Sequence, residues 1–510
     1  MSNQSANNKR IAKNTLMLYI RMLLIMGVSL YTSRIILKTL GVEDFGIYNV
    51  VAGVITMLSF LTGSLGGSSS RFITYALGKD DAENVKQVFS SILYLHIALA
   101  ILVFIIGETV GLWFVYNKLV IPEERLNAAL WVYHCSILTM MVSVISVPYN
   151  SLIIAHERMG AFAYISIIEV ILKFGIVFLL LYLPFDRLAT YAVLLLIVQI
   201  LIRLSYNLYC KKHFIEAMVR PKKNLLLIKD MLSYTTWTLA SSVAVVGYTQ
   251  GLNILLNIFF GPIVNAARGI SVQVQSAIMS FVSNFQTAMR PQIIKSYAVG
   301  QLDYMHKLVV MSSKFGLLLM MFLTVPVIVC IHPILRIWLD AVPEHTANFV
   351  IIMLISGLIE PYKVALLNAI HATGDIKKFQ IYESIFLLLV LPIAYVLLKW
   401  CNISPEMVML VYLAIQFITQ IVRMVIVLPK ISMSIGCYFR KVLFPLLKVL
   451  PFIVSILYFV RLSSWDSFSI VAVWVVSIEL FLAVISILLY LSKEERLFLL
   501  SKIKKIFTIK

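Results

Sequence analysis

The chain has 510 residues, of which 61% are hydrophobic and only 13% are charged, and its mean hydropathy is +0.93. This composition excludes an ordinary soluble domain and predicts an integral membrane protein built of helices, because apolar runs of 18 or more residues recur along the whole length. The formal charge is +19, but the basic residues lie in short loops between apolar runs, which excludes a soluble nucleic-acid-binding domain.

Fourteen membrane-spanning helices are predicted in chain order. Their centres lie near residues 26, 55, 100, 138, 174, 199, 244, 277, 322, 357, 388, 416, 452 and 480. The loops on the side of the two termini contain 27 Lys and Arg residues, and those on the opposite side contain 7. This bias predicts a multi-pass membrane protein with both termini in the cytoplasm.

One phrase occurs twice with the same internal spacing. YALGKDD begins at Tyr75 and YAVGQLD begins at Tyr297, just after the predicted second and eighth spans. A second pair, Gly160 and Gly374, is separated by a similar 214 positions, and each glycine has a glutamate nine residues later. An offset of six spans preserves orientation in the membrane, so the repeat predicts two lobes related by a pseudo-twofold axis along the membrane normal.

The repeat sets the expected domain boundaries. They are residues 1–210 for a first six-helix lobe, 211–230 for a cytoplasmic linker, 231–430 for a second six-helix lobe, and 431–510 for two additional transmembrane helices with a basic tail.

Polar faces on three predicted spans indicate where a substrate would bind. Asn14, Arg21 and Thr32 lie within about 20° of one another on span one. Spans seven and eight carry similar faces, and a hydrated cleft between the lobes is therefore expected. The candidate substrate-binding residues are Arg21, Arg34, Gln250, Asn253, Arg268, Gln275, Gln286 and Arg290. Hydrogen bonding between helices remains the alternative for the neutral residues, and Arg34 near a span end could reach the lipid headgroups instead.

Acidic residues are few in the spans. Glu169 and Lys173 are four residues apart and are expected to neutralise each other, although both remain candidates for binding a coupling ion. Glu383 has Leu387 at the corresponding position, so we expect it to lack a partner and to be a proton or sodium site. His96 is more simply explained as a packed histidine than as a proton relay.

No signature of catalysis or of metal binding is found. The five cysteines are far apart and form no Cys-x-x-Cys pair, and there is no phosphate-binding glycine loop or His/Cys ligand set. No cofactor, no metal and no enzymatic activity are predicted.

The chain resembles the polysaccharide exporters, or O-antigen flippases, of the multidrug/oligosaccharidyl-lipid/polysaccharide flippase superfamily. The resemblance rests on SRIILKTLGVEDFGIYNVV at residues 33–51, on SSSRFITYALGKDD after the second span, and on the arrangement of six, six and two helices. It implies a carrier that moves undecaprenyl-diphosphate-linked oligosaccharide to the outer leaflet by alternating access of a cationic central cavity. The partners implied are this lipid, membrane lipids, a proton or sodium ion, and other polysaccharide assembly proteins of O-antigen or lipopolysaccharide synthesis.

Besides a scaffold within a synthesis complex, two alternatives remain open at this point. One is a multidrug or organic-cation antiporter of the same superfamily, which would favour acidic groups where span one has Arg21. The other is a membrane-embedded polysaccharide polymerase or ligase, which usually needs a longer outer loop than this chain offers.

Overall fold

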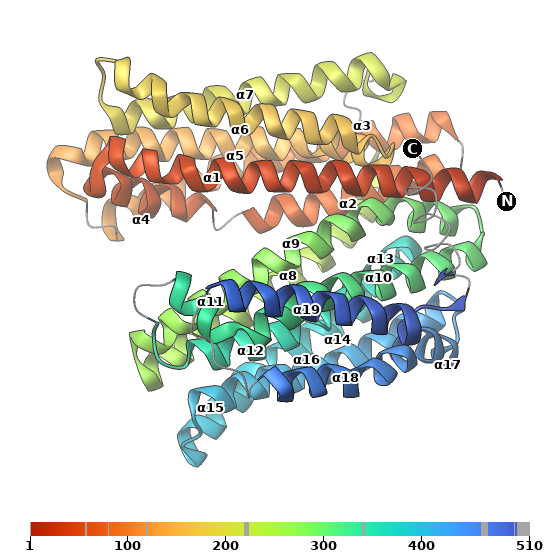
Figure 1. The fold of residues 1–510 in the computed structure, drawn as a ribbon. Helices are drawn as coiled ribbons and strands as arrows, with labels where there is room; N and C mark the ends of the chain where they lie inside the picture. The colour runs from red at the N-terminus through yellow and green to blue at the C-terminus, as the bar shows by residue number, and fades with distance from the viewer. Residues whose placement is uncertain are drawn as a thin grey trace, which may run out of the picture. The chain divides into compact units, whose positions relative to one another are not determined.

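The computed structural model describes residues 2–56, 59–79, 81–118, 121–218, 224–338, 342–460, 468–493 and 495–496. These residues form helices and no strand (Figure 1). Since lipid offers no hydrogen-bonding partner to the backbone, helices satisfy each peptide group internally. The predicted all-α membrane architecture is confirmed.

Eleven segments of the described chain are long and apolar enough to span a bilayer, from Arg10–Val28 to Ala472–Tyr490. Three further helices, α2 (Ser59–Gly78), α9 (Pro262–Ala298) and α18 (Phe444–Val460), lie between these segments in the sequence. Together they are compatible with the expected number of about fourteen.

The contacts divide the chain into two compact units. Unit 1 contains Met1–Ser242 and Thr287–Gln301, and unit 2 contains Val243–Gln286 and Leu302–Lys510. The helices α8 (Leu225–Phe260) and α9 therefore each contribute to both units. These units are defined by packing, and the lobe boundaries expected from the repeat stay a prediction.

Unit 1 is an all-helical bundle in which α5 packs against α7 and α6 packs against α1. Besides α2 and the ends of α8 and α9, its α-helices are α1 (Ser2–Thr56), α3 (Ala82–Ile106), α4 (Leu112–Lys118), α5 (Leu126–Ala155), α6 (Met159–Tyr182) and α7 (Arg187–His213). Two clusters of buried apolar side chains form its core, one of them around Phe89 and Ile153 and the other around Val132 and Val144.

Unit 2 packs α16 against α12, α13 and α14. In addition to parts of α8 and α9 and to α18, its α-helices are α10 (Leu302–Val329), α11 (Ile331–Trp338), α12 (Thr346–Gly357), α13 (Glu360–Thr373), α14 (Lys377–Leu388), α15 (Val390–Cys401), α16 (Pro405–Lys430), α17 (Ile435–Tyr438) and α19 (Phe468–Ile485). The helix α19 packs on α10 through Ile478, Leu482 and Val325. A buried ion pair, Lys314 Nζ to Glu495 Oε2 at 2.6 Å, holds the segment after α19 to the same helix.

The two repeated phrases meet inside unit 1. Gly78 ends α2 and Ala298 ends α9, and a Cβ atom placed on Gly78 would lie 2.8 Å from the Ala298 Cβ and 3.2 Å from the Lys295 Cα. No side chain fits there without moving a backbone. The first copy of the phrase therefore needs its glycine for close packing against the second copy.

Replacing Gly78 with alanine should lower the free energy of unfolding by about 1 to 3 kcal/mol, because the added methyl group overlaps Ala298. Thermal unfolding of the detergent-purified protein would measure this loss. Gly175→Ala on α6 is the matched control, since no atom lies within 4 Å of a Cβ at that position. The control should be neutral or up to about 1 kcal/mol more stable, as expected for Gly→Ala in a helix. Equal stability of the two variants would contradict the packing described here.

Candidate substrate-binding site

Three arginines of the predicted site have no carboxylate partner. Arg21, Arg268 and Arg290 form none of the ion pairs found among the described residues, although only 5% of Arg268 is exposed. In each of the three, the Nε atom is buried and lacks a hydrogen-bond acceptor. A guanidinium group in such a position retains capacity to bind an anion.

Arg21 is on α1 in unit 1, and its side chain reaches α6. Its guanidinium carbon lies 4.4 Å from the centre of the Phe162 ring, and Tyr206 on α7 and the Glu169 carboxylate are nearby. Lys173 Nζ lies 2.6 Å from Glu169 Oε1, which confirms the expected pair on α6. Because Lys173 already neutralises that carboxylate, Arg21 keeps its charge available.

Arg268 lies in unit 2 within a chain of polar groups. Its Nη1 donates a hydrogen bond to Asn253 Oδ1, and Asn253 Nδ2 donates to Gln250 Oε1 at 3.1 Å. The structure thus brings three of the predicted residues together. Two tyrosines that the sequence analysis did not select, Tyr248 and Tyr412, lie near Arg268 and stack with ring centres 6.1 Å apart.

The polar face extends along α16. Gln416 donates to the Tyr248 hydroxyl at 3.3 Å, and Gln416, Gln420 and Arg423 are all buried. Tyr412, Gln416 and Arg423 recur at intervals of four and seven residues, which places them on one helix face. This spacing was a signal available in the sequence.

Arg290 does not join the Arg268 group. The helix α9 continues through Pro291 to Ala298, as expected, and 22 residues of helix separate the two arginines by about 33 Å along its axis. Arg290 Nη2 donates to the Gly67 carbonyl oxygen of α2 at 2.8 Å inside unit 1. The two guanidinium groups therefore cannot hold the same phosphate group.

Two predicted glutamines fasten helices to one another. Gln275 Nε2 donates to the Met353 carbonyl oxygen at 2.8 Å, and Gln286 Nε2 donates to the Pro361 carbonyl oxygen at 2.7 Å. Both contacts support the alternative of helix-to-helix hydrogen bonding. The side chain of Arg34, also a candidate, lies outside the described residues.

The expectation for Glu383 is wrong in one respect, because this carboxylate does have a cationic partner. Arg423 on α16 donates from Nε to Glu383 Oε1 at 2.9 Å, and its Nη2 lies 2.7 Å from the same oxygen. Both side chains are at least 94% buried. The guanidinium thus occupies the place that a proton or sodium ion would take, and the coupling role of Glu383 stays a prediction.

Removing one member of this pair should leave a buried charge without compensation. We expect Glu383→Gln to lower the free energy of unfolding by about 3 to 5 kcal/mol, and the double variant with Arg423→Met to recover part of that loss. Thermal unfolding in detergent provides the measurement. The control is Asp375→Asn, which breaks a pair with Lys430 in which the Asp375 side chain is 69% exposed, and it should cost less than about 1 kcal/mol. If Glu383→Gln lowers the free energy of unfolding no more than Asp375→Asn does, the Glu383 pair is not structurally important.

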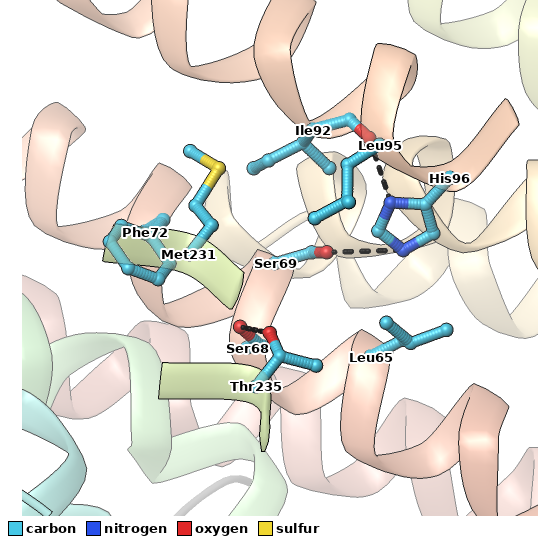
Figure 2. Close-up of a pocket in the computed structure, with 9 residues that line it drawn as sticks. All are labelled: Leu65, Ser68, Ser69, Phe72, Ile92, Leu95, His96, Met231 and Thr235. Carbon is cyan, nitrogen blue, oxygen red and sulfur yellow. Dashed lines mark hydrogen bonds between the residues drawn. The ribbon is translucent and has the colours of Figure 1, made fainter. Parts of the chain in front are cut away.

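His96 borders a small cavity in unit 1 (Figure 2). Its ring bonds to the Ile92 carbonyl oxygen at 2.8 Å and approaches Ser69 Oγ at 3.4 Å, while Ser68 and Thr235 share a hydrogen bond of 2.8 Å. The cavity volume is about 10 Å³, which is room for about one water molecule and far below the size of a pocket for a drug-sized ligand. These contacts agree with a packed histidine, and the cavity is too small for an oligosaccharide.

A buried carboxylate that sequence reasoning missed lies between α5 and α6. Glu157 is 4% exposed and accepts hydrogen bonds from Gln292 at 2.7 Å and from Lys295 at 2.8 Å, both on α9. The φ angle of Glu157 is 58°, in the left-handed region that favours glycine. The turn between α13 and α14 also has a left-handed residue, and there it is a glycine, Gly374. A non-glycine residue held in this region costs on the order of 1 kcal/mol. Glu157 thus fastens the end of α9 to unit 1.

No group of three or more histidine, cysteine, aspartate or glutamate side chains in the described part of the chain is arranged to hold a metal ion.

A family model for polysaccharide biosynthesis proteins matches residues 11–296, which is more than half of the chain. The chain belongs to this family. A comparison of this polysaccharide biosynthesis protein with curated proteins gives no significant match. The resemblance noted in the sequence is therefore confirmed at the level of the family.

Solved structures show the fold of this family member. An outward-facing multidrug resistance MATE family transporter of the MOP superfamily superposes with a TM-score of 0.73 at 14% identity, covering 84% of this chain and 96% of the other. A MOP superfamily transporter from Pyrococcus furiosus gives 0.71 at 14% identity, with 83% and 96% covered. A MATE in the straight conformation gives 0.73 at 14% identity, with 84% and 96% covered. The polysaccharide biosynthesis protein is thus a multi-pass membrane protein with the MATE transporter fold.

Proposed function

We propose that this protein is a flippase that moves undecaprenyl-diphosphate-linked oligosaccharide across the bacterial inner membrane for the synthesis of a surface polysaccharide. The observation that carries the proposal is a set of guanidinium groups, Arg21, Arg268 and Arg290, that form no ion pair among the described residues and whose Nε atoms are buried without an acceptor; Arg268 is buried and the other two side chains are half-buried. The family and the transporter fold support the class of activity.

A diphosphate is the kind of group that such arginines bind. Placing a basic residue near the bilayer centre costs on the order of 3 kcal/mol, so an uncompensated one indicates either water or an anionic ligand. The planar guanidinium group binds phosphate oxygens through two parallel hydrogen bonds. Arg21 within unit 1 and Arg268 within unit 2 are the proposed phosphate contacts, each considered in its own unit, with Arg290 and Arg34 as further candidates.

The neutral groups beside Arg268 suit a sugar chain. Gln250 and Asn253 offer amide donors and acceptors, and Tyr248 offers a hydroxyl that Gln416 orients. Neutral sugars present many hydroxyl groups, which this kind of surface can hydrogen bond. Gln275 and Gln286 would act indirectly, by holding α9 to its neighbours.

The rival function is export of organic cations by a multidrug antiporter. Such a substrate needs an available carboxylate, whereas Glu169, Glu383 and Glu157 are each paired with a lysine or an arginine. The Pyrococcus furiosus relative is described as having a binding pocket of reverse polarity that suggests a different function. Reversal of pocket charge on this fold thus has a precedent, and it favours an anionic substrate here.

The remaining features of the carrier belong to the same proposal. Both termini lie in the cytoplasm, transport proceeds by alternating access, and a proton or sodium ion drives it, with Glu169, Lys173 and Glu383 as candidate coupling groups. MATE structures of the same fold exist in straight and bent conformations, which supports a moving scaffold. The protein acts without a cofactor, alongside other assembly proteins, and it is not an enzyme.

Charge reversal at Arg21 or Arg268 tests the anion site. Arg268→Glu and Arg21→Glu should each reduce export at least 100-fold, because like charges repel a diphosphate by several kcal/mol, and Arg268→Lys should keep part of the activity. The measurement is the amount of lipid-diphosphate oligosaccharide that accumulates in the inner leaflet of cells whose only copy is the variant. Arg158→Glu, at an exposed loop position, controls for the change in net charge.

Three results would count against the proposal. Normal surface polymer after deletion of the gene would exclude the flippase. Efflux of tetraphenylphosphonium by the wild type, lost in neither arginine variant, would favour the organic-cation antiporter. Accumulation of unpolymerised but fully flipped lipid in the deletion strain would favour a polymerase or ligase.

A further inference from the structure

Two ion pairs occupy equivalent places in the two units. Arg125 and His345 directly precede α5 and α12, and they lie 220 positions apart. Their partners, Asp186 and Glu406, stand at the starts of α7 and α16, again 220 positions apart. In unit 1 α5 packs against α7, and in unit 2 α12 packs against α16. Each pair therefore ties together the beginnings of two neighbouring helices.

In the unit 1 pair, the Arg125 guanidinium stays charged at every ordinary pH. Arg125 contacts Asp186 Oδ2 and Asp44 Oδ2 at 2.6 Å each. Burial alone would raise the pKa of Asp186, but the hydrogen bonds from the Ala189 amide and from Arg125 outweigh it and hold the pKa below its usual value. Because arginine stays protonated and Asp186 stays ionised, this contact weakens only when the pH falls through the lowered pKa of the aspartate.

The pair in unit 2 contains an imidazole instead. His345 Nδ1 hydrogen bonds to Glu406 Oε1, and Asn348 Nδ2 donates to the same oxygen at 3.3 Å. His345 has a φ of 66°, in the left-handed region, and its side chain does not cap α12. About a quarter of each side chain is exposed, so protons from solution can reach the pair.

We propose that His345 and Glu406 form a proton-binding site that ties α12 to α16 when His345 is protonated, and that this site is the pH-responsive counterpart of the permanent Arg125 pair. Histidine is the side chain that changes charge between about pH 5 and 8. A protonated ring attracts the ionised Glu406 carboxylate, so the contact is stronger while both groups are charged and weaker once the imidazole is neutral. The loop charges place this end of unit 2 on the outer side, where it would respond to the external pH.

Other titratable groups near this end of unit 2 leave the assignment unchanged. Glu344 precedes His345 and is exposed, His332 and Arg336 on α11 are exposed, and Lys399 on α15 is exposed. None of these four forms an ion pair in the part of the chain that the structure describes. Asp340 lies outside the described residues.

Hydrogen–deuterium exchange of the purified full-length protein tests this site locally. The amide of Phe349 donates to the His345 carbonyl oxygen at 3.0 Å and reports on the first turn of α12. After correction for the intrinsic exchange rate, protection of this turn and of the start of α16 should be about fivefold higher at pH 5.5 than at pH 8. His345→Arg should give the high amide protection of pH 5.5 at both pH values. His345→Gln should give the low amide protection of pH 8 at both pH values.

The reciprocal exchange in unit 1 is the second arm. Arg125→His should give the start of α5 a pH-dependent protection that the wild type lacks there. The control is His134→Gln, which removes a histidine of α5 and should leave the pH dependence of protection in α12 unchanged. A flat profile for α12 in the wild type, or an unchanged profile in His345→Arg, would overturn the proposal. This readout does not involve transport, so it stands or falls separately from the flippase.

Discussion

A buried charge in a membrane protein needs a partner, and this requirement sorts the basic residues of the chain into two groups. Arg423 and Lys314 each meet a carboxylate within 2.7 Å from another part of the chain and hold segments together, whereas Lys173 meets Glu169 at 2.6 Å within α6. Arg21 and Arg268 meet aromatic rings and neutral amides instead. The first group accounts for stability. The second leaves positive charge inside each unit, and an anionic substrate is the simplest reason for a protein to keep it there.

The helices α8 and α9 each carry polar side chains in both units. Each is about 55 Å long, well beyond the thickness of a bilayer, and each divides its contacts between unit 1 and unit 2. On α9, Arg268 belongs to unit 2, whereas Gln292 and Lys295 bind Glu157 in unit 1. The helix α9 thus carries both the arginine proposed to bind phosphate and the two residues that bind Glu157.

Sequence patterns predicted the features that depend on neighbouring positions. The helical spans, the Glu169–Lys173 pair and the face shared by Gln250 and Asn253 all follow from local spacing, and the structure agrees with them. The pattern failed for Glu383, because its partner is 40 positions away on another helix, where no periodicity links them. It also missed Glu157, whose importance depends on a left-handed backbone conformation that composition does not reveal.

Because unit 1 is completed by Thr287–Gln301, its assembly has an order in time. When the first 242 residues have left the ribosome, Ala298, which later packs against Gly78, has not yet been synthesised. The Glu157 carboxylate likewise lacks its later partners, the Gln292 amide and the Lys295 ammonium group. About 60 more residues must be synthesised first, which takes on the order of 3 to 12 s at ordinary rates of translation. During that interval the nascent bundle has an open seam, and this is when a membrane chaperone or a quality-control protease would encounter it.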